Sequence, residues 1–204
     1  MGIETCAIIE NRLPANKFRM LAGQLTENAQ LAVCMREFDA AMRSYSPQVR
    51  AELHAEPWQF QETEQWVIEG GWDAGCRGQC KGPFGNLGLY DNLAKLNWYW
   101  CGWRVFIEDK QFRKPVYKAT RIISNILNLG TASTAIFIPD SGRYDATRVF
   151  DELHRTMPEA LTFLNDQGCP PAESLEAIAN VPREGYCVTQ WPDATAANSA
   201  KSES

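Results

Sequence analysis

The sequence predicts a single α+β domain that is rich in helix and carries a small mixed sheet. At 204 residues the chain is long for one domain and short for two, and no polar, low-complexity linker divides it. Helical and strand patterns both occur, but they do not alternate strictly, which favours α+β over a doubly wound sheet. We expect the domain to cover residues 1–193 and the small polar residues 194–204 to form a disordered tail.

The first third of the chain predicts a strand followed by helices. A β-rich run at residues 3–9 is typical of a strand. Apolar residues then recur at helical spacing over residues 18–25 and 31–42, which predicts two consecutive helices or one bent helix. The serine–proline pair at residues 46–47 predicts the start of a short helix. Residues 58–69 alternate loosely, as in a strand whose polar side chains face outward.

A glycine-rich segment follows at residues 70–88. It reads GGWDAGCRGQCKGPFGNLG and holds seven of the fourteen glycines in the chain. Each glycine in a regular element costs backbone entropy on folding, so this density predicts a long loop. Long loops in compact domains are often functional, which makes this segment a candidate site.

The segment KLNWYWCGWRVF at residues 95–106 is the most aromatic part of the chain. As a strand it would have to be buried on both faces, with Arg104 buried as well. We therefore favour a helix that begins near Asp91, and the strand remains the alternative. In the helix the apolar positions form one continuous stripe at steps of three and four, through Leu93, Leu96, Trp100, Trp103 and Ile107.

The second half of the chain predicts four helices and two strands. The first helix stops at Gly130, a residue suited to the left-handed conformation that closes helices. A buried strand is predicted at residues 131–139, and a closing strand at residues 185–191. The predicted helices cover residues 115–127, 146–153, 158–168 and 170–182.

Composition limits the possible partners. The formal net charge of −5 argues against non-specific binding to nucleic acid, which depends on lysine and arginine. No apolar run reaches the length of a membrane-spanning helix, and no secretory signal is recognisable. Seven cysteines, an odd number, fit reduced thiols better than a disulfide framework, so we expect a cytoplasmic protein. Residues 110–121 hold five basic and no acidic residues, a segregation that could steer a charged partner.

Catalytic and metal-binding signatures are weak. Cys76 and Cys80 form the only close cysteine pair, whereas a structural zinc site needs four ligands, so we expect no metal and no cofactor. The G-x-S-x-G and H-E-x-x-H motifs are absent. His54 and His154 are the only histidines, a poor supply of general bases. We therefore expect no catalytic residues.

Two functions from different classes remain. The first is a non-enzymatic binding or inhibitor protein, of immunity or counter-defence character, that holds a protein partner through an aromatic and charged surface. The alternative is a protein or enzyme that binds an anionic or nucleotide-like small molecule, with residues 70–88 as a flap. The ligand-binding residues expected for that site are three cations and three aromatic side chains: Arg77, Lys81, Arg104, Trp72, Phe84 and Tyr90.

Overall fold

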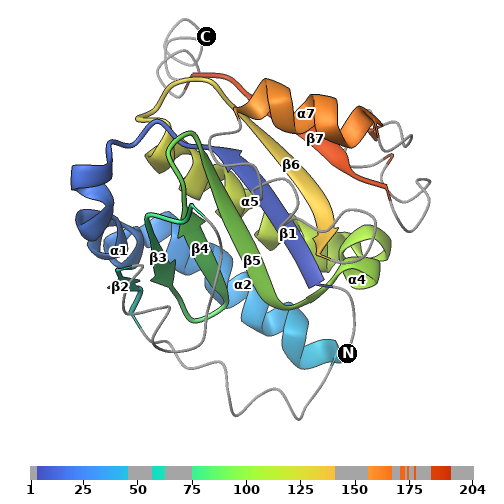
Figure 1. The fold of residues 1–204 in the computed structure, drawn as a ribbon. Helices are drawn as coiled ribbons and strands as arrows, with labels where there is room; N and C mark the ends of the chain where they lie inside the picture. The colour runs from blue at the N-terminus through green and yellow to red at the C-terminus, as the bar shows by residue number, and fades with distance from the viewer. Residues whose placement is uncertain are drawn as a thin grey trace, which may run out of the picture.

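Seven strands form one sheet at the centre of the computed structural model, which describes residues 4–45, 57–62, 75–140, 156–166, 171–172, 174, 177 and 185–193 (Figure 1). The strand order is β2-β3-β4-β5-β1-β6-β7, and each neighbouring pair of these strands is antiparallel. The strands are β1 (Glu4–Glu10), β2 (Gln59–Gln61), β3 (Gly78–Lys81), β4 (Gly85–Leu89), β5 (Leu93–Gly102), β6 (Ser133–Asp140) and β7 (Cys187–Trp191). The predicted small mixed sheet is therefore wrong.

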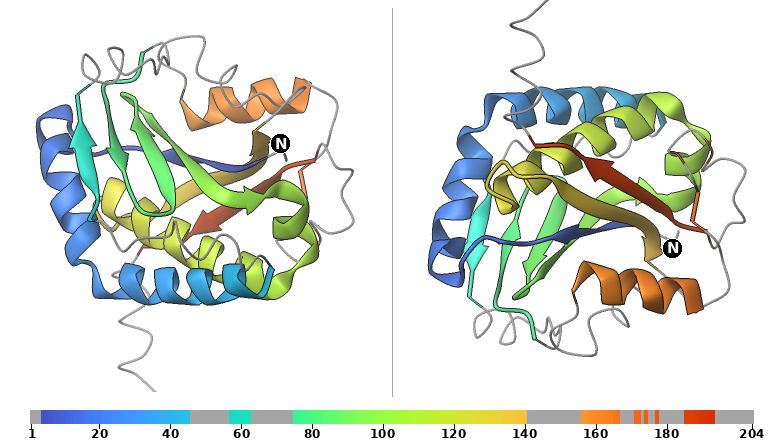
Figure 2. Two further views of the ribbon diagram at one scale, coloured as in Figure 1. Left: turned by 90° about the horizontal axis from the view of Figure 1, so that it is seen from below. Right: turned by 90° about the horizontal axis from the view of Figure 1, so that it is seen from above.

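Helices cover both faces of the sheet. Helices α1, α2 and α5 lie on one face, and α7 lies on the other (Figures 1 and 2). The helical elements are η1 (Ala15–Lys17), α1 (Phe18–Glu27), α2 (Ala29–Tyr45), α4 (Trp103–Glu108), α5 (Lys110–Leu127) and α7 (Met157–Asp166). None of the helices among the described residues combines the length and the apolar character needed to cross a membrane.

Two hydrophobic clusters, one on each face, explain why β1 and β6 are mostly apolar on both sides. Ala7 and Ile9 of β1 join the larger cluster, under α1, α2 and α5. Cys6 and Ile8, which alternate with them, join the smaller cluster under α7. Strand β6 divides its side chains in the same way. When neither face of a strand contacts solvent, both faces need apolar side chains, so the sequence of the strand is a continuous apolar run.

The aromatic segment is a strand that passes into a short helix, so the helix predicted from near Asp91 is wrong. Strand β5 continues to Gly102, and α4 begins at Trp103. Arg104, whose burial argued against a strand, lies beyond the strand and is exposed on α4. Two elements of different period share this segment, which is why neither a pure helix nor a pure strand pattern fits it.

The glycine-rich segment is largely strand, so a long loop over residues 70–88 is also wrong. Residues 78–81 and 85–89 are paired as β3 and β4, while residues 70–74 lie outside the described part of the chain. Two glycines are required by close approach. A Cβ at Gly82 would lie 2.5 Å from the Trp58 ring, and one at Gly85 would lie 2.6 Å from the carbonyl oxygen of Asn97.

Most other predicted elements are confirmed. The strand at 3–9 is β1, the two helices before residue 46 are α1 and α2, and the two later strands are β6 and β7. The helix predicted at 115–127 is the C-terminal part of α5, and Gly130 has a φ of 80° as expected. The helix from Pro158 is α7. The predictions for residues 46–47, 146–153 and 194–204, and most of 170–182, lie outside the described residues.

Candidate functional site

One face of the sheet changes from apolar to polar between β1 and β5. On the α7 side, β1 and β6 present apolar side chains that pack under the helix. On the same side, the four strands β2, β3, β4 and β5 present mainly polar side chains. We call this set the polar face; it consists of Gln59, Gln61, Gln79, Lys81, Asn86, Lys95 and Asn97.

The strand register assembles the polar face in two rows. In an antiparallel sheet, residues directly opposite each other point to the same side. Asn97 of β5 lies opposite Asn86 of β4, which lies opposite Lys81 of β3. In the second row, Lys95 and Gln79 flank Gly88 from either side. Residues far apart in the sequence are thus placed side by side without any loop.

Three amide oxygens of the polar face are buried without a hydrogen-bond partner. Asn86 and Asn97 are half-buried, and the described part of the structure gives neither side chain a hydrogen bond, although both Oδ1 atoms are shielded from solvent. Gln79, only 3% exposed, donates from Nε2 to Gln61 Oε1 over 2.7 Å, but its own Oε1 has no partner. A buried unpaired polar group costs about 1–3 kcal/mol, so three of them on one surface require an explanation.

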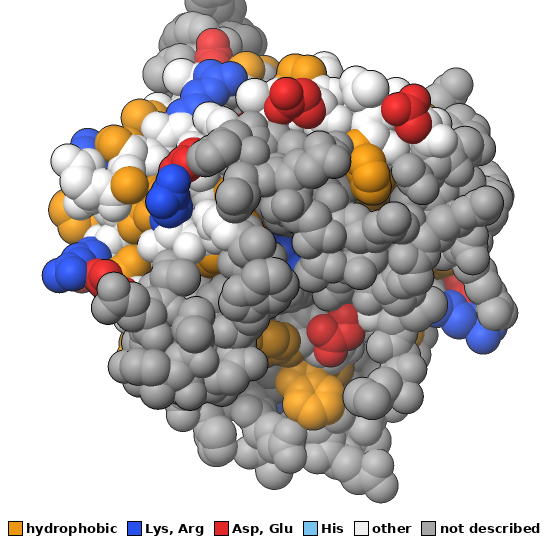
Figure 3. All heavy atoms as spheres, in the orientation of Figure 1, with side chains coloured by type: hydrophobic (Ala, Val, Ile, Leu, Met, Phe, Trp, Pro, Cys, Tyr) orange, Lys and Arg blue, Asp and Glu red, His pale blue; other side chains and the backbone are white. Residues whose placement is uncertain are grey.

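Two lysines give the polar face a positive charge. Lys81 is exposed, whereas Lys95 is 6% exposed although lysine is rarely buried to this degree. Figure 3 looks onto this side of the molecule and shows a small area of Lys or Arg surface near its centre. Amides beside recessed positive charge form a surface that can accept hydrogen bonds from a ligand and attract an anion.

Of the residues predicted from the sequence, the structure brings two to this side of the sheet. Lys81 is part of the polar face. Tyr90 belongs to the cluster under α7, and a Cβ at Gly88 would be 3.5 Å from its ring. The Tyr90 ring therefore borders the row that contains Lys95.

The other predicted residues lie apart from one another. Arg77 makes two hydrogen bonds to Asp91, of 3.1 and 3.0 Å, and this carboxylate raises the pKa of the guanidinium. Phe84 is buried on the opposite face, stacked on Trp98 with ring centroids 5.0 Å apart. Arg104 pairs with Glu108 on the surface of α4. Trp72 lies outside the described residues.

Cys76 and Cys80 point to different layers of the molecule. Cys76 belongs to the cluster under α7, and Cys80 to the cluster on the opposite face. Burial raises the pKa of the Cys80 thiol to about 12, so the thiol is protonated at neutral pH. The described residues contain no group of three or more side chains suited to hold a metal ion.

Sequence reasoning missed the amides and Lys95. A signal was present, because polar residues occupy alternate positions at 79 and 81 and again at 95 and 97. This period of two is that of a strand with one polar face. It was hidden because one pair lies in the segment interpreted as a loop, and the other in the segment interpreted as a helix.

A second feature is the exposed side chain of Trp100, on a β-bulge at the end of β5. The register against β1 jumps here, because Thr5 lies opposite Trp98 but Glu4 lies opposite Gly102. Trp100 has a φ of 65° and is 47% exposed. A bulky residue in this left-handed region costs about 1–3 kcal/mol, and such strain concentrates at functional positions.

Both neighbours of Trp100 are held in place. The backbone N–H of Tyr99 donates to the Phe84 carbonyl over 2.9 Å. On the other side, the Cys101 thiol donates to Thr5 Oγ1 over 3.3 Å in a fully buried position. The bulge is therefore anchored to β1 on one side and to the residue before β4 on the other, and the indole of Trp100 is exposed above this anchored backbone.

Comparison of the chain with protein-family models, with curated proteins and with solved structures returned no match in any of the three.

Proposed function

We propose that the polar face binds a small polar ligand that carries negative charge, such as a nucleotide-like molecule. The observation that supports this most directly is the pair Asn86 and Asn97, which lie opposite each other with shielded, unpartnered oxygens. N–H or O–H groups of a ligand would satisfy these oxygens, and thereby remove a cost that the fold alone does not explain. An acidic group of the ligand would lie against the exposed Lys81.

The composition of the polar face favours binding over catalysis. Its seven side chains are amides and lysines, and none is a carboxylate, an imidazole or a hydroxyl. Acid–base or nucleophilic chemistry needs such groups, whereas recognition of a polar ligand needs a few well-placed donors and acceptors. The proposed function is therefore that of a ligand-binding protein, and the site lies on strands rather than on a flap.

Thermal shift measurements test this proposal. The probes are AMP, ADP, ATP, glucose 6-phosphate and inorganic phosphate, since a ligand that binds the folded state raises Tm with its concentration. For a probe that binds, Lys81→Met should weaken binding about tenfold, because one charge-assisted contact is lost. Lys114→Met is the matched control, since Lys114 is an exposed lysine on α5, on the other side of the sheet.

Two results would contradict the proposal. One is that no probe raises Tm at millimolar concentration. The other is that Lys81→Met and Asn97→Ala both bind as tightly as the unmodified protein.

A second candidate function, binding to a protein partner, is supported by Trp100. Tryptophan is enriched among the residues that dominate protein interfaces, and here it is exposed on a strained but anchored bulge. Affinity capture from host extract should recover a partner with the unmodified protein but not with Trp100→Ala. Met20→Ala is the control, because Met20 is another exposed hydrophobic side chain, on α1. Equal recovery by the three proteins would exclude Trp100 as the anchor.

We also propose a reducing compartment, the cytoplasm, as the site of action. The six cysteines in the described part of the chain are free thiols and all are buried. Fractionation of host cells with detection of the chain tests this assignment, and recovery outside the cytoplasm would contradict it.

A further inference from the structure

A groove of about 620 Å³ lies on the opposite side of the molecule from the polar face. Its walls are the first turns of α2, the outer surface of α5 and the end of β7. Pockets of roughly 300–1,000 Å³ are typical of small-molecule sites. Nothing in the function proposed above uses this groove.

The described lining of the groove carries positive charge. Lys118 and Arg121 of α5 line it, together with side-chain amides and hydroxyls, and the described lining residues include no aspartate or glutamate. Lys118 Nζ lies 3.2 Å from Glu37 Oε2, so its charge is partly neutralised. Arg121 is exposed, and the structure shows no ion pair or hydrogen bond from its guanidinium to the described residues. Arg121 is therefore the group available to an anion.

The start of α2 adds to this potential. Asn28 accepts a hydrogen bond from the Leu31 backbone N–H over 2.9 Å, which caps the helix, and Asn28 and Gln30 both line the groove. The positive end of the α2 dipole thus faces the same space as Arg121.

Apolar side chains form the rest of the lining. Val33 of α2 is 44% exposed, and Ile122 and Ile126 of α5 are half-buried. Trp191 also lines the groove, and its Nε1 donates to the Tyr117 hydroxyl over 2.8 Å, which fixes the indole. A ligand that fits this lining has an apolar body as well as an acidic group.

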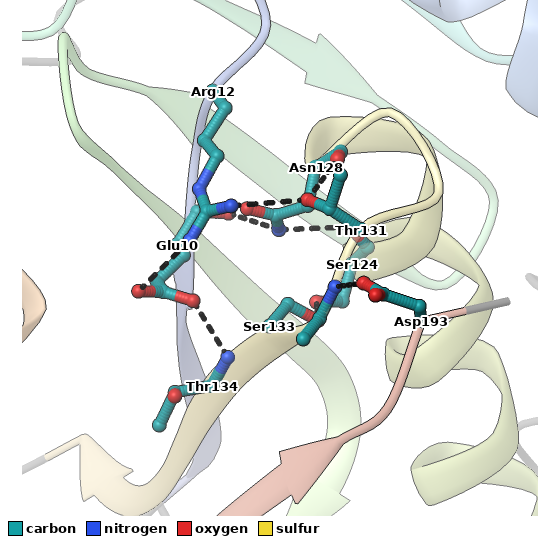
Figure 4. A network of polar contacts seen from close by, with 9 residues as sticks. Glu10, Arg12, Ser124, Asn128, Thr131, Ser133, Thr134 and Asp193 are labelled. Carbon is teal, nitrogen blue, oxygen red and sulfur yellow. Dashed lines mark hydrogen bonds and ion pairs between the residues drawn. The ribbon is translucent and has the colours of Figure 1, made fainter. Parts of the chain in front are cut away.

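Hydrogen bonds hold the end of the groove at Thr131 and Ser133 (Figure 4). Ser133 Oγ lies 2.8 Å from Ser124 Oγ in a buried pair. Thr131 Oγ1 donates to the Asn128 carbonyl over 2.7 Å and accepts from Arg12 Nη1 over 3.0 Å. These bonds join β6 to α5 and to the chain after β1, so this wall keeps its shape without a ligand.

We propose that this groove is a second binding site, for an organic anion with an apolar body, whose acidic group lies against Arg121. The apolar residues of α2 and α5 contact the body of the ligand. The seven side chains of the polar face, in contrast, are all polar, so we expect the two sites to select different ligands.

Fluorescence titration tests this proposal with two related probes. The first, 8-anilinonaphthalene-1-sulfonate, combines an aromatic body with a negative charge, and N-phenyl-1-naphthylamine has a similar body without the charge. The sulfonate should bind the unmodified protein saturably at one site and more tightly than the neutral probe. Arg121→Gln should weaken sulfonate binding about tenfold, the loss expected for one charge-assisted contact, and should leave neutral-probe binding unchanged.

Two further variants separate the groove from general charge effects. Arg36→Gln removes an exposed arginine of α2 that does not line the groove, so it should not change sulfonate binding. Asn125→Asp adds a negative charge inside the groove without removing a cation, and should weaken sulfonate binding as well. Non-saturable binding, an equal effect of Arg121→Gln and Arg36→Gln, or no effect of Arg121→Gln and Asn125→Asp would overturn the proposal. None of these results bears on nucleotide binding at the polar face.

Discussion

A pair of asparagine substitutions distinguishes a binding surface from a structural polar network. Asn11 is buried with both amide atoms in use, because Nδ2 donates to the Tyr90 carbonyl over 2.7 Å and Oδ1 accepts from the Leu13 N–H over 3.1 Å. Asn11→Ala removes two hydrogen bonds of about 1 kcal/mol each and leaves two backbone groups unpaired. We expect the free energy of unfolding to fall by about 2–4 kcal/mol.

Asn97→Ala is expected to have almost no effect on stability. Its side chain makes no hydrogen bond to the described residues, and its shielded oxygen is already unpartnered. The substitution removes an uncompensated polar group and a little packing, which nearly cancel, and alanine and asparagine are both weak strand formers. The free energy of unfolding should therefore change by less than about 0.5 kcal/mol.

Urea denaturation and calorimetry measure both variants. For a chain of this size about 1 kcal/mol shifts Tm by about 3 °C, so Asn11→Ala should melt about 6–12 °C lower and Asn97→Ala within about 2 °C of the unmodified protein. If Asn97→Ala is destabilised as strongly as Asn11→Ala, the amides of the polar face support the fold, and the argument for a ligand there fails.

Three further predictions concern other parts of the molecule. Leu129→Gly should raise the free energy of unfolding in urea by about 1 kcal/mol, since Leu129 has a φ of 55° and is 59% exposed; no gain would show that the left-handed conformation is not strained. Arg113→Met should lower the free energy of unfolding by about 2 kcal/mol, because the buried guanidinium donates to two carbonyls at the end of α4 over 3.1 and 2.7 Å. An unchanged urea midpoint would contradict this prediction. Burial raises the pKa of the Cys80 and Cys101 thiols from 9.0 to about 12, so the unfolded thiols ionise first and stability should fall as pH rises from 9 to 12. A double Cys→Ala variant should lose that part of the slope, and an identical slope would refute the assignment.

The elements predicted correctly are those whose pattern has one cause. Helix α5 packs a single stripe against the sheet, including Val116, Ala119 and Ile123, and its spacing alone identifies it. Strand β6 is buried on both faces, and its apolar run between a glycine and a proline indicates a strand. In both elements the local sequence reports directly on what surrounds the backbone.

In the elements predicted wrongly, more than one structural requirement determines the residue pattern. The glycines of β4 and of the turn before it suit close contacts with the neighbouring strand and with Trp58, so their number reflects packing rather than a long loop. In the aromatic segment, Trp98 faces the core as part of a strand, Trp100 leaves the ladder at a bulge, and Trp103 begins a helix. A window that covers all three positions averages over two periods and a register shift, and therefore fits neither.

The polar face lies beyond local sequence analysis for a different reason. Its members come from four strands, and they share a surface only because the register places Asn97 opposite Asn86 and Gly88 between Lys95 and Gln79. A shift of one residue in a single strand would send that strand's polar side chains to the core face and its apolar ones to the polar face. The apolar alternation on the core side, through Leu96, Leu87 and Cys80, therefore determines where the amides lie. Packing on one face of the sheet thus positions the residues of the proposed ligand site on the other.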